Sequence, residues 1–201
     1  AGDDELLIPM KVGLFFGSFN PVHTGHLIIA EHVAGLAGVD QVWFVVSPHN
    51  PFKDKASLAK DYDRLHLVHL AIDDNPRLRA SPVEFHLPQP SYTVDTLAHL
   101  KEKYPQHEFF LILGSDALPT LNKWKNAEFL LDNYRFCIYR RPGSEDPEAF
   151  VEHPAFRWCK APLLDISASY IRECIRQGRS VRYLIPDKVF AFLEETTLYR
   201  T

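Results

Sequence analysis

Short apolar runs alternate along the chain with stretches of helical periodicity. The clearest runs are Val12–Phe16, Gln41–Val46, Phe109–Leu113 and Arg135–Tyr139, and less regular ones are Leu78–Phe85 and Ala161–Ile166. Runs of this length without polar alternation are typical of strands that are buried on both faces. Strands that alternate with helical segments indicate βαβ units. The pattern therefore predicts a single α/β domain in which helices flank a mostly parallel sheet.

The helical segments carry apolar residues three and four positions apart. We expect helices that begin near Gly25, at Tyr62–Asp73, at Tyr92–Tyr104, within Leu118–Leu131 and at about Pro186–Glu195. Asp61 is positioned to cap the second helix, Trp124 falls inside the fourth, and Pro186 suits the first turn of the last. No repeat or linker divides the chain. Residues 1–201 are therefore expected to form one domain, with residues 1–9 as a loose leader.

Composition narrows the classes of protein that the chain can represent. Hydrophobic residues make up 46% of the 201 residues and charged residues 24%, as in ordinary globular proteins. The net charge of −4 argues against nucleic acid or membrane surfaces as partners. No apolar run approaches the roughly 20 residues that span a bilayer. The three cysteines form no C-x-x-C pair, which indicates free thiols and a cytoplasmic protein. Homo-oligomerisation is left open.

The most informative stretch is Val12–His26, where a strand, a tight turn and a helix start follow one another. In open parallel sheets, ligands bind beyond the carboxyl ends of the strands, where helix N-termini offer N–H groups to anions. His23 and His26 stand at this junction with Gly25 between them, so they can donate hydrogen bonds to a phosphate. A zinc site is less favoured because no cysteine lies nearby, and the G-x-G-x-x-G spacing of dinucleotide-binding turns is missing.

Two further polar groups lie where predicted strands end. Ser167, Ser169 and Arg172 open a helix, and their hydroxyl, N–H and guanidinium donors suit a second anion site. A plain helix cap is the alternative role for Ser167. Asp116 follows the third clear apolar run, where it can accept from ribose hydroxyls while Gly114 permits close backbone approach. A helix cap is the alternative there too.

Four segments resemble a known family. Residues 17–26, G-S-F-N-P-V-H-T-G-H, are similar to the G-[GS]-[ST]-F-[DN]-P-[VI]-H-x-G-H segment of the H-x-G-H nucleotidyltransferase superfamily. Residues 166–172, I-S-A-S-Y-I-R, resemble its second motif, I-S-S-T-x-I-R. P-S-Y-T-V-D-T-L at 90–97 and G-S-D-A-L-P-T-L-N-K-W at 114–124 narrow the likeness. In this order the four segments resemble bacterial nicotinate-nucleotide adenylyltransferases, the enzymes that make deamido-NAD.

The resemblance implies a Rossmann-like fold and, in NAD biosynthesis, transfer of AMP from ATP to nicotinate mononucleotide. Mg²⁺ would be carried by the ATP phosphates, with no metal ligand from the protein. The catalytic residues would be His23, His26 and Arg172. The ATP-binding residues would be Gly17, Ser18, Phe19, Gly25, Lys53, Gly114, Asp116, Ser167 and Ser169. Tyr92, Thr93 and Trp124 would bind the nicotinate nucleotide, with Trp124 stacked on the pyridine ring.

Several of these residues could instead have ordinary structural or solvent-exposed roles. An isolated Lys53 on a loop is ordinarily solvated, and Trp124 in a helix is more often a core residue. Ala168 and Ser169 replace the usual Ser and Thr of the second motif, which leaves the role of each hydroxyl open.

Three rival functions remain open on the sequence. The first is another nucleotidyltransferase of the superfamily, with pantetheine phosphate or nicotinamide mononucleotide as acceptor; pantetheine-specific relatives are shorter and lack the P-S-Y-T-x-D-T-L segment. The second is a nucleotide-binding regulatory module, which would not need His23, His26 and Arg172 together. The third is a fragment of a class I aminoacyl-tRNA synthetase, but no K-M-S-K-S-like segment follows.

Overall fold

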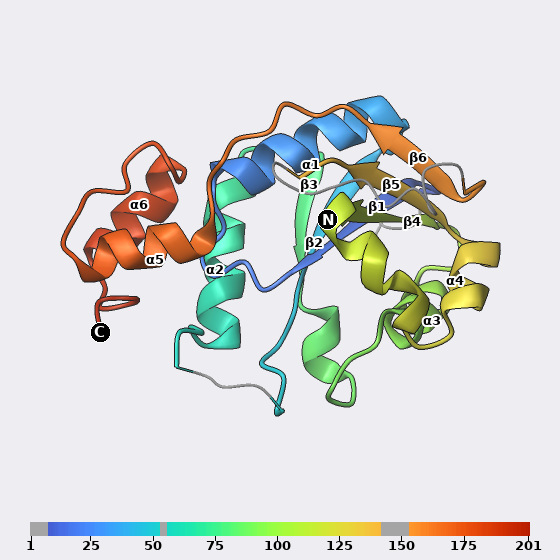
Figure 1. Ribbon diagram of the computed structural model, residues 1–201, viewed down its shortest axis with the longest axis horizontal. Helices are drawn as coiled ribbons and strands as arrows, with labels where there is room; N and C mark the ends of the chain where they lie inside the picture. The colour runs from blue at the N-terminus through green and yellow to red at the C-terminus, as the bar shows by residue number, and fades with distance from the viewer. Residues whose placement is uncertain (1–7, 53–55, 142–152) are drawn as a thin grey trace.

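The computed structural model describes residues 8–52, 56–141 and 153–201, and these form one α/β unit around a sheet (Figure 1). Within them, six parallel strands are ordered β3-β2-β1-β4-β5-β6. Their bounds are β1 Lys11–Gly17, β2 Gln41–Val46, β3 Leu78–Ser81, β4 Glu108–Gly114, β5 Arg135–Tyr139 and β6 Phe156–Cys159. The order reverses between β1 and β4, and such a reversal opens a crevice beyond the carboxyl ends of those strands.

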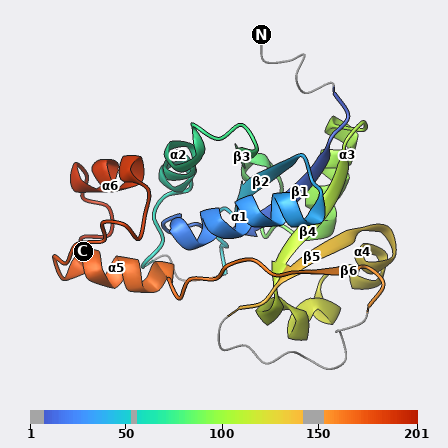
Figure 2. The same ribbon diagram turned by 90° about the horizontal axis from the view of Figure 1, so that it is seen from above.

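Helices cover both faces of the sheet. One core contains residues of α1 (Thr24–Ala37), α2 (Asp61–Ile72), α5 (Ala168–Arg176) and α6 (Asp187–Glu194). The other contains residues of α3 (Thr93–Lys103), α4 (Ala127–Asn133) and the 3₁₀ segment η3 (Ser115–Lys123). A short 3₁₀ turn, η2 (Val83–His86), follows β3. Both ribbon views place α5 and α6 at one side of the sheet, with the C-terminus beside α5 (Figures 1 and 2).

Alternate residues of the central strands feed the two cores. In β2, Phe44 lies in the core beneath α1 and α2, whereas its neighbours Trp43 and Val45 lie in the core beneath α3. In β1, Phe15 and Leu14 divide in the same way. Successive strand residues point to opposite faces, so a strand covered on both sides must be apolar throughout. The predicted parallel α/β fold is therefore confirmed.

The predicted strand Ala161–Ile166 is wrong. The last strand is β6, Phe156–Cys159, which pairs with β5 at the sheet edge. Pro162 cannot donate a ladder hydrogen bond, and residues 163–166 instead run along the wall of a cleft. The predicted strand Leu78–Phe85 ends at Ser81, because the chain continues from there into η2.

Three helix expectations also need correction. Trp124 lies outside any helix, directly after η3, because Pro119 lies within that segment and disfavours α-helix. Asp61 does not cap α2, whose N-cap residue is Lys60 without a side-chain hydrogen bond. Pro186 is the N-cap of α6 rather than its first-turn residue. Most of the expected leader, residues 1–9, lies outside the described residues. No helix of the described part has the length and apolarity needed to cross a membrane.

Candidate active site

His23 and His26 cap the first turn of α1 reciprocally. His23 is the N-cap residue, and its Nδ1 accepts the backbone N–H of His26 at 3.4 Å. The Nδ1 of His26 accepts the backbone N–H of His23 at 3.1 Å. The two rings stack with their centroids 3.7 Å apart. This arrangement satisfies N–H groups that a helix start otherwise leaves without an acceptor, and it fixes both rings at the carboxyl end of β1.

Both imidazoles are held neutral. Burial and the Arg141 guanidinium lower the pKa of His23 to about 4. Burial, followed by the charges of His23 and Arg141, holds the pKa of His26 well below its usual range. Because Nδ1 of each neutral ring accepts a backbone N–H, the ring proton must be on Nε2. Each histidine therefore has an N–H donor on the side opposite its cap, and both side chains line the cleft.

The turn between β1 and α1 is shaped by a buried aromatic side chain. Phe19 has a φ of 46° and is 2% exposed, with its ring 5.0 Å from that of His26. Gly17 makes room for that ring, since a Cβ at this position would lie 3.1 Å from it. Gly25 is constrained similarly, because its Cβ would lie 2.9 Å from Cε1 of His23. The glycines of this motif therefore serve the placement of Phe19 and His23.

The start of α5 forms the opposite wall. Ser167 is the N-cap residue, and its Oγ accepts the backbone N–H of Tyr170 at 3.1 Å. The helix-cap role is thus observed for Ser167. Arg172 donates from Nη1 to the carbonyl of Asn20 at 2.8 Å and from Nη2 to Oγ of Ser169 at 3.3 Å. The guanidinium therefore reaches from α5 to the turn after β1.

One cleft of about 780 Å³ joins the two walls. Seven of the fifteen predicted site residues line it: Ser18, His23, Gly25, His26, Ser167, Ser169 and Arg172. They come from segments about 140 residues apart in sequence, brought together where the strand order reverses. The lining of the cleft includes hydroxyl, imidazole and guanidinium donors, a set suited to a polyanion.

Gly114 and Asp116 lie at the edge of this cleft rather than in its described lining. Asp116 Oδ1 is 3.5 Å from Nε of Arg141, which does line the cleft. A Cβ at Gly114 would lie 2.5 Å from the same carboxylate oxygen, so a side chain there would displace the Asp116 carboxylate. The helix-cap alternative for Asp116 is excluded, because Gly114 is the N-cap residue of η3. Arg141 was missed by the sequence analysis.

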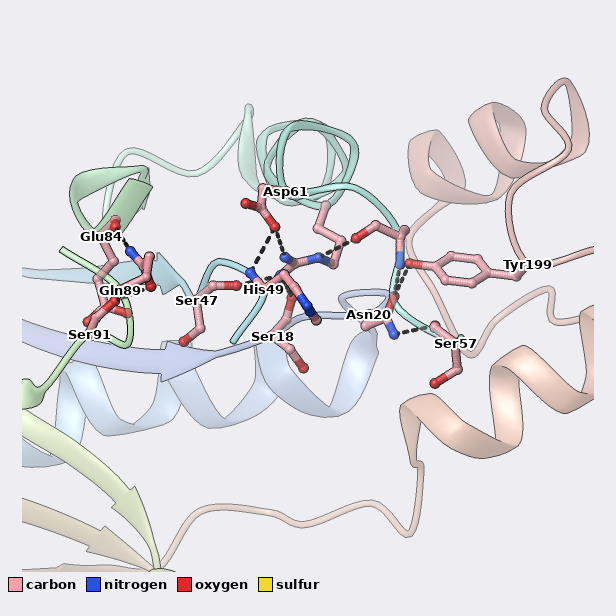
Figure 3. A network of polar contacts seen from close by, with 12 residues as sticks. Ser18, Asn20, Ser47, His49, Ser57, Asp61, Glu84, Gln89, Ser91 and Tyr199 are labelled. Carbon is pink, nitrogen blue, oxygen red and sulfur yellow. Dashed lines mark hydrogen bonds and ion pairs between the residues drawn. The ribbon is translucent and has the colours of Figure 1, made fainter. Parts of the chain in front are cut away.

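Arg64, a fully buried residue of α2, was also missed. Its Nη1 donates to the carbonyls of Ser18 and Ser47 at 2.7 Å each, and Nη2 donates to Oδ1 of Asp61 at 2.6 Å. Asp61 also accepts the backbone N–H of His49 at 3.0 Å (Figure 3). The Asp61 carboxylate is thus used as the counter-charge of a buried guanidinium, which is why it does not cap α2. Arg64 joins the loops that follow β1 and β2.

Comparison with known proteins identifies the family. A family model described as cytidylyltransferase-like matches residues 14–174. A probable nicotinate-nucleotide adenylyltransferase of Cytophaga hutchinsonii is 52% identical over 181 residues, covering 90% of this chain and 93% of the relative. One of Flavobacterium psychrophilum is 48% identical over 192 residues, covering 95% of this chain and 100% of the relative. The chain belongs to the nicotinate-nucleotide adenylyltransferase family.

Solved structures share the fold. A Plasmodium falciparum nicotinic acid mononucleotide adenylyltransferase complexed with NaAD superposes with a TM-score of 0.79 at 21% identity, covering 94% of this chain and 97% of that one. A putative nicotinate-nucleotide adenylyltransferase from Vibrio parahaemolyticus gives a TM-score of 0.69 at 20% identity, with 94% and 95% covered. At these identities the likeness concerns the fold, and it agrees with the Rossmann-like sheet described above.

The residues that the adenylyltransferase resemblance assigned to the acceptor gather beside the N-terminus of α3. Tyr92 is the N-cap residue of this helix and Thr93 its first residue. Lys125, next to Trp124, lies over the Tyr92 ring at 5.0 Å and pairs with Asp95 at 2.9 Å. None of Tyr92, Thr93 and Trp124 belongs to the described cleft lining. Lys53 lies outside the described residues.

Glu84 connects the cleft to the start of α3. This carboxyl side chain lines the cleft although the residue is only 5% exposed, and its Oε2 accepts from Oγ1 of Thr96 at 2.7 Å. Burial raises the pKa of Glu84. Its carbonyl accepts from the side chain of Gln89, which begins the segment leading to Tyr92 (Figure 3). Because Oγ1 of Thr96 is also within 3.2 Å of the Tyr92 carbonyl, polar contacts lead from the cleft through Glu84 and Thr96 to Tyr92.

Proposed function

We propose that this member of the family transfers AMP from Mg·ATP to nicotinate mononucleotide, releasing pyrophosphate and deamido-NAD. The observation that carries the proposal is the pair of neutral histidines that faces Arg172 across one cleft. Relatives that cover nearly the whole chain are named for this activity. The three cysteines are free and buried, and cytoplasm is the proposed location.

The proposed reaction needs no covalent enzyme intermediate. A phosphate oxygen of nicotinate mononucleotide attacks the α-phosphorus of ATP in line, an O–P bond forms, and the bond to the pyrophosphate oxygen breaks. Negative charge grows on the α-phosphate and leaving oxygens, so catalysis consists of positioning and charge stabilisation. The Nε2–H groups of His23 and His26 are proposed to donate to these oxygens. Neutral donors are suited to this role because they need not exchange a proton during the step.

The β- and γ-phosphates are proposed to bind at the start of α5. Arg172 would supply two parallel N–H donors and Ser167 and Ser169 their hydroxyls, next to the positive end of the helix dipole. Mg²⁺ enters with ATP as part of the substrate. Among the described residues, no cluster of three or more His, Cys, Asp or Glu side chains is arranged to hold a metal ion.

A pyrophosphate-release assay with Mg²⁺ and ATP tests the proposal. The acceptors compared are nicotinate mononucleotide, nicotinamide mononucleotide and pantetheine phosphate. Release should be fastest with nicotinate mononucleotide, and mass spectrometry should detect deamido-NAD as the product. Faster release with either other acceptor would assign the chain a different substrate, and ATP binding without release would indicate a sensor.

A further inference from the structure

The C-terminal segment contacts the turn between β1 and α1, which leads into His23 and His26. The hydroxyl of Tyr199 donates to Oδ1 of Asn20 at 2.6 Å, across 179 positions of sequence. Figure 3 shows the Tyr199 ring directed at the Asn20 side chain from the side of the C-terminal helices. Tyr199 lies outside the four motifs that carry the family resemblance. The contact is therefore a tertiary one that no motif of the site contains.

Asn20 is a point where several segments meet. Its Nδ2 donates to the carbonyl of Ser57 at 2.8 Å, and its Oδ1 also accepts the backbone N–H of Ala59 at 3.2 Å. Its own carbonyl accepts from Nη1 of Arg172 at 2.8 Å. Asn20 is only 5% exposed. Water therefore cannot readily replace the partners of its side chain and carbonyl, and losing one of these hydrogen bonds is costly. A shift of Asn20 would move the carbonyl that positions Arg172.

Tyr199 is itself held in place by its neighbours. Its φ of 65° lies in the left-handed region that residues other than glycine rarely adopt. Arg200 stabilises this bend, with Nε donating to the carbonyl of Thr196 at 2.9 Å and Nη2 to that of Leu193 at 3.2 Å. The bond to Leu193 also satisfies a carbonyl in the last turn of α6. The chain thus turns sharply after α6 and directs the Tyr199 ring into the protein.

The Tyr199 hydroxyl remains a donor throughout the pH range of activity assays. Burial raises the pKa of Tyr199 above its usual range, while the nearby guanidinium groups of Arg64 and Arg172 act in the opposite direction and Asp63 adds to the rise. A protonated phenol donates one strong hydrogen bond. Asn20 Oδ1 accepts that bond together with the backbone N–H of Ala59, so removing the hydroxyl alone would take away the shorter of these two bonds and leave the ring in place.

We infer that Tyr199 is a positioning residue for the ATP triphosphate, acting through Asn20 on both the turn after β1 and Arg172. The inference rests on the proposed function, because it assigns the triphosphate to the Arg172 side of the cleft. Tyr199 does not line the cleft, as far as the described residues define it, and so acts without touching the nucleotide. The C-terminal segment therefore helps to set the distance between His23 and His26 on one wall of the cleft and Arg172 on the other.

The test compares Tyr199→Phe with Tyr183→Phe, whose side chain belongs to a residue that is 81% exposed in the same C-terminal region. The Kd of Mg·ATP is measured by calorimetry without acceptor, so that no turnover occurs. Tyr199→Phe should raise this Kd about 5- to 10-fold, the effect of one lost hydrogen bond. Tyr183→Phe should leave it unchanged, and the Kd for nicotinate mononucleotide should be unchanged in both variants.

A double-variant cycle separates positioning from a general loss of stability. If Tyr199 acts through Asn20 on Arg172, Tyr199→Phe should weaken ATP binding less in an Arg172→Lys background than in the parent. An ATP Kd within twofold of the parent for Tyr199→Phe, or losses that multiply in the double variant, would overturn the inference. Should Tyr199→Phe not fold, Arg200→Ala loosens the same bend without altering Asn20 or Tyr199, and an unchanged Kd there would also overturn it. Absence of pyrophosphate release by a parent that binds ATP would instead refute the proposed reaction.

Discussion

His23 and His26 each use Nδ1 to accept the other's backbone N–H, so one pair of side chains both begins α1 and presents two Nε2–H donors. The cap fixes which nitrogen carries the proton, and burial keeps both rings neutral. Structure and proposed chemistry therefore depend on opposite nitrogens of the same ring. They can be separated experimentally.

Replacing His23 with Asn should keep the cap and remove the donor. Asn is among the preferred N-cap residues because its side-chain oxygen accepts from the first turn, but it has no group that reaches the position of Nε2. Thermal unfolding of His23→Asn should therefore match the parent closely, while turnover falls on the order of 10²-fold. His23→Ala is the control, since it should lose the same turnover and also about 1 kcal/mol of stability. Turnover of His23→Asn within threefold of the parent would show that the ring does not act in catalysis.

The low pKa of His23 predicts a specific dependence of stability on pH. The unfolded chain takes up a proton near pH 6.5, whereas the folded protein does so only near the pKa of about 4. The His23 contribution is therefore fully present above pH 6.5 and is lost as the pH falls toward 4, by about 3 kcal/mol. Urea unfolding of the parent and of His23→Asn from pH 7.5 to 4 measures this together with the coupled change at His26, because groups that do not interact with His23 cancel in the difference. Parallel curves for the two proteins would contradict the assigned pKa.

Two glycines of α1 provide a matched pair. A Cβ at Gly25 would lie 2.9 Å from Cε1 and 3.0 Å from Nδ1 of His23, whereas one at Gly35 would meet no atom within 4 Å. Gly25→Ala should displace the His23 ring and lower turnover roughly 10- to 100-fold. Gly35→Ala should leave turnover unchanged and stabilise the helix by about 1 kcal/mol. Equal turnover in the two variants would mean that the ring tolerates displacement.

Local patterns in the sequence account for what was predicted correctly. Gln41–Val46 and Arg135–Tyr139 are strands with the predicted bounds, because burial on both faces requires continuous apolar runs. The edge strand β6 was missed because only its last residue, Cys159, is buried and its sequence, F-R-W-C, includes a charge. The more apolar segment after it contains Pro162 and lines the cleft instead. Apolarity alone does not distinguish these two uses.

The site residues that could be predicted from the sequence are likewise those that lie within one local pattern. His23 and His26 share one short motif, so their spacing was visible in the sequence. Arg64 binds the carbonyl of Ser18, 46 positions earlier, and Tyr199 binds Asn20 across 179. Such partners depend on how helices dock on the sheet. Of the two, only Arg64 could be predicted from the sequence, because it lies four positions before Val68 on the buried side of α2. A charged residue at such a position needs several partners.

The final prediction concerns selection of the acid over the amide at the acceptor site. Thr93 opens α3, and the N-cap residue Tyr92 makes no side-chain cap hydrogen bond, so the helix start is suited to a carboxylate. The donors proposed there are the Thr93 hydroxyl and the backbone N–H groups of the first turn. An amide would turn its own NH₂ toward one of these donors, and neither the NH₂ nor that donor would then have an acceptor. Sites of this kind can reject an analogue by up to ~10⁴-fold. Thr93→Val should mainly erode the preference in kcat/KM for nicotinate over nicotinamide mononucleotide. Trp124→Leu should weaken both acceptors equally, because either pyridine ring can stack on the indole. Thr120→Val, at an exposed threonine of η3, controls for loss of a hydroxyl. If Thr93→Val retains the parent's preference, the carboxylate is recognised elsewhere. If the parent uses both acceptors equally, recognition of the carboxylate by donors at the start of α3 is refuted.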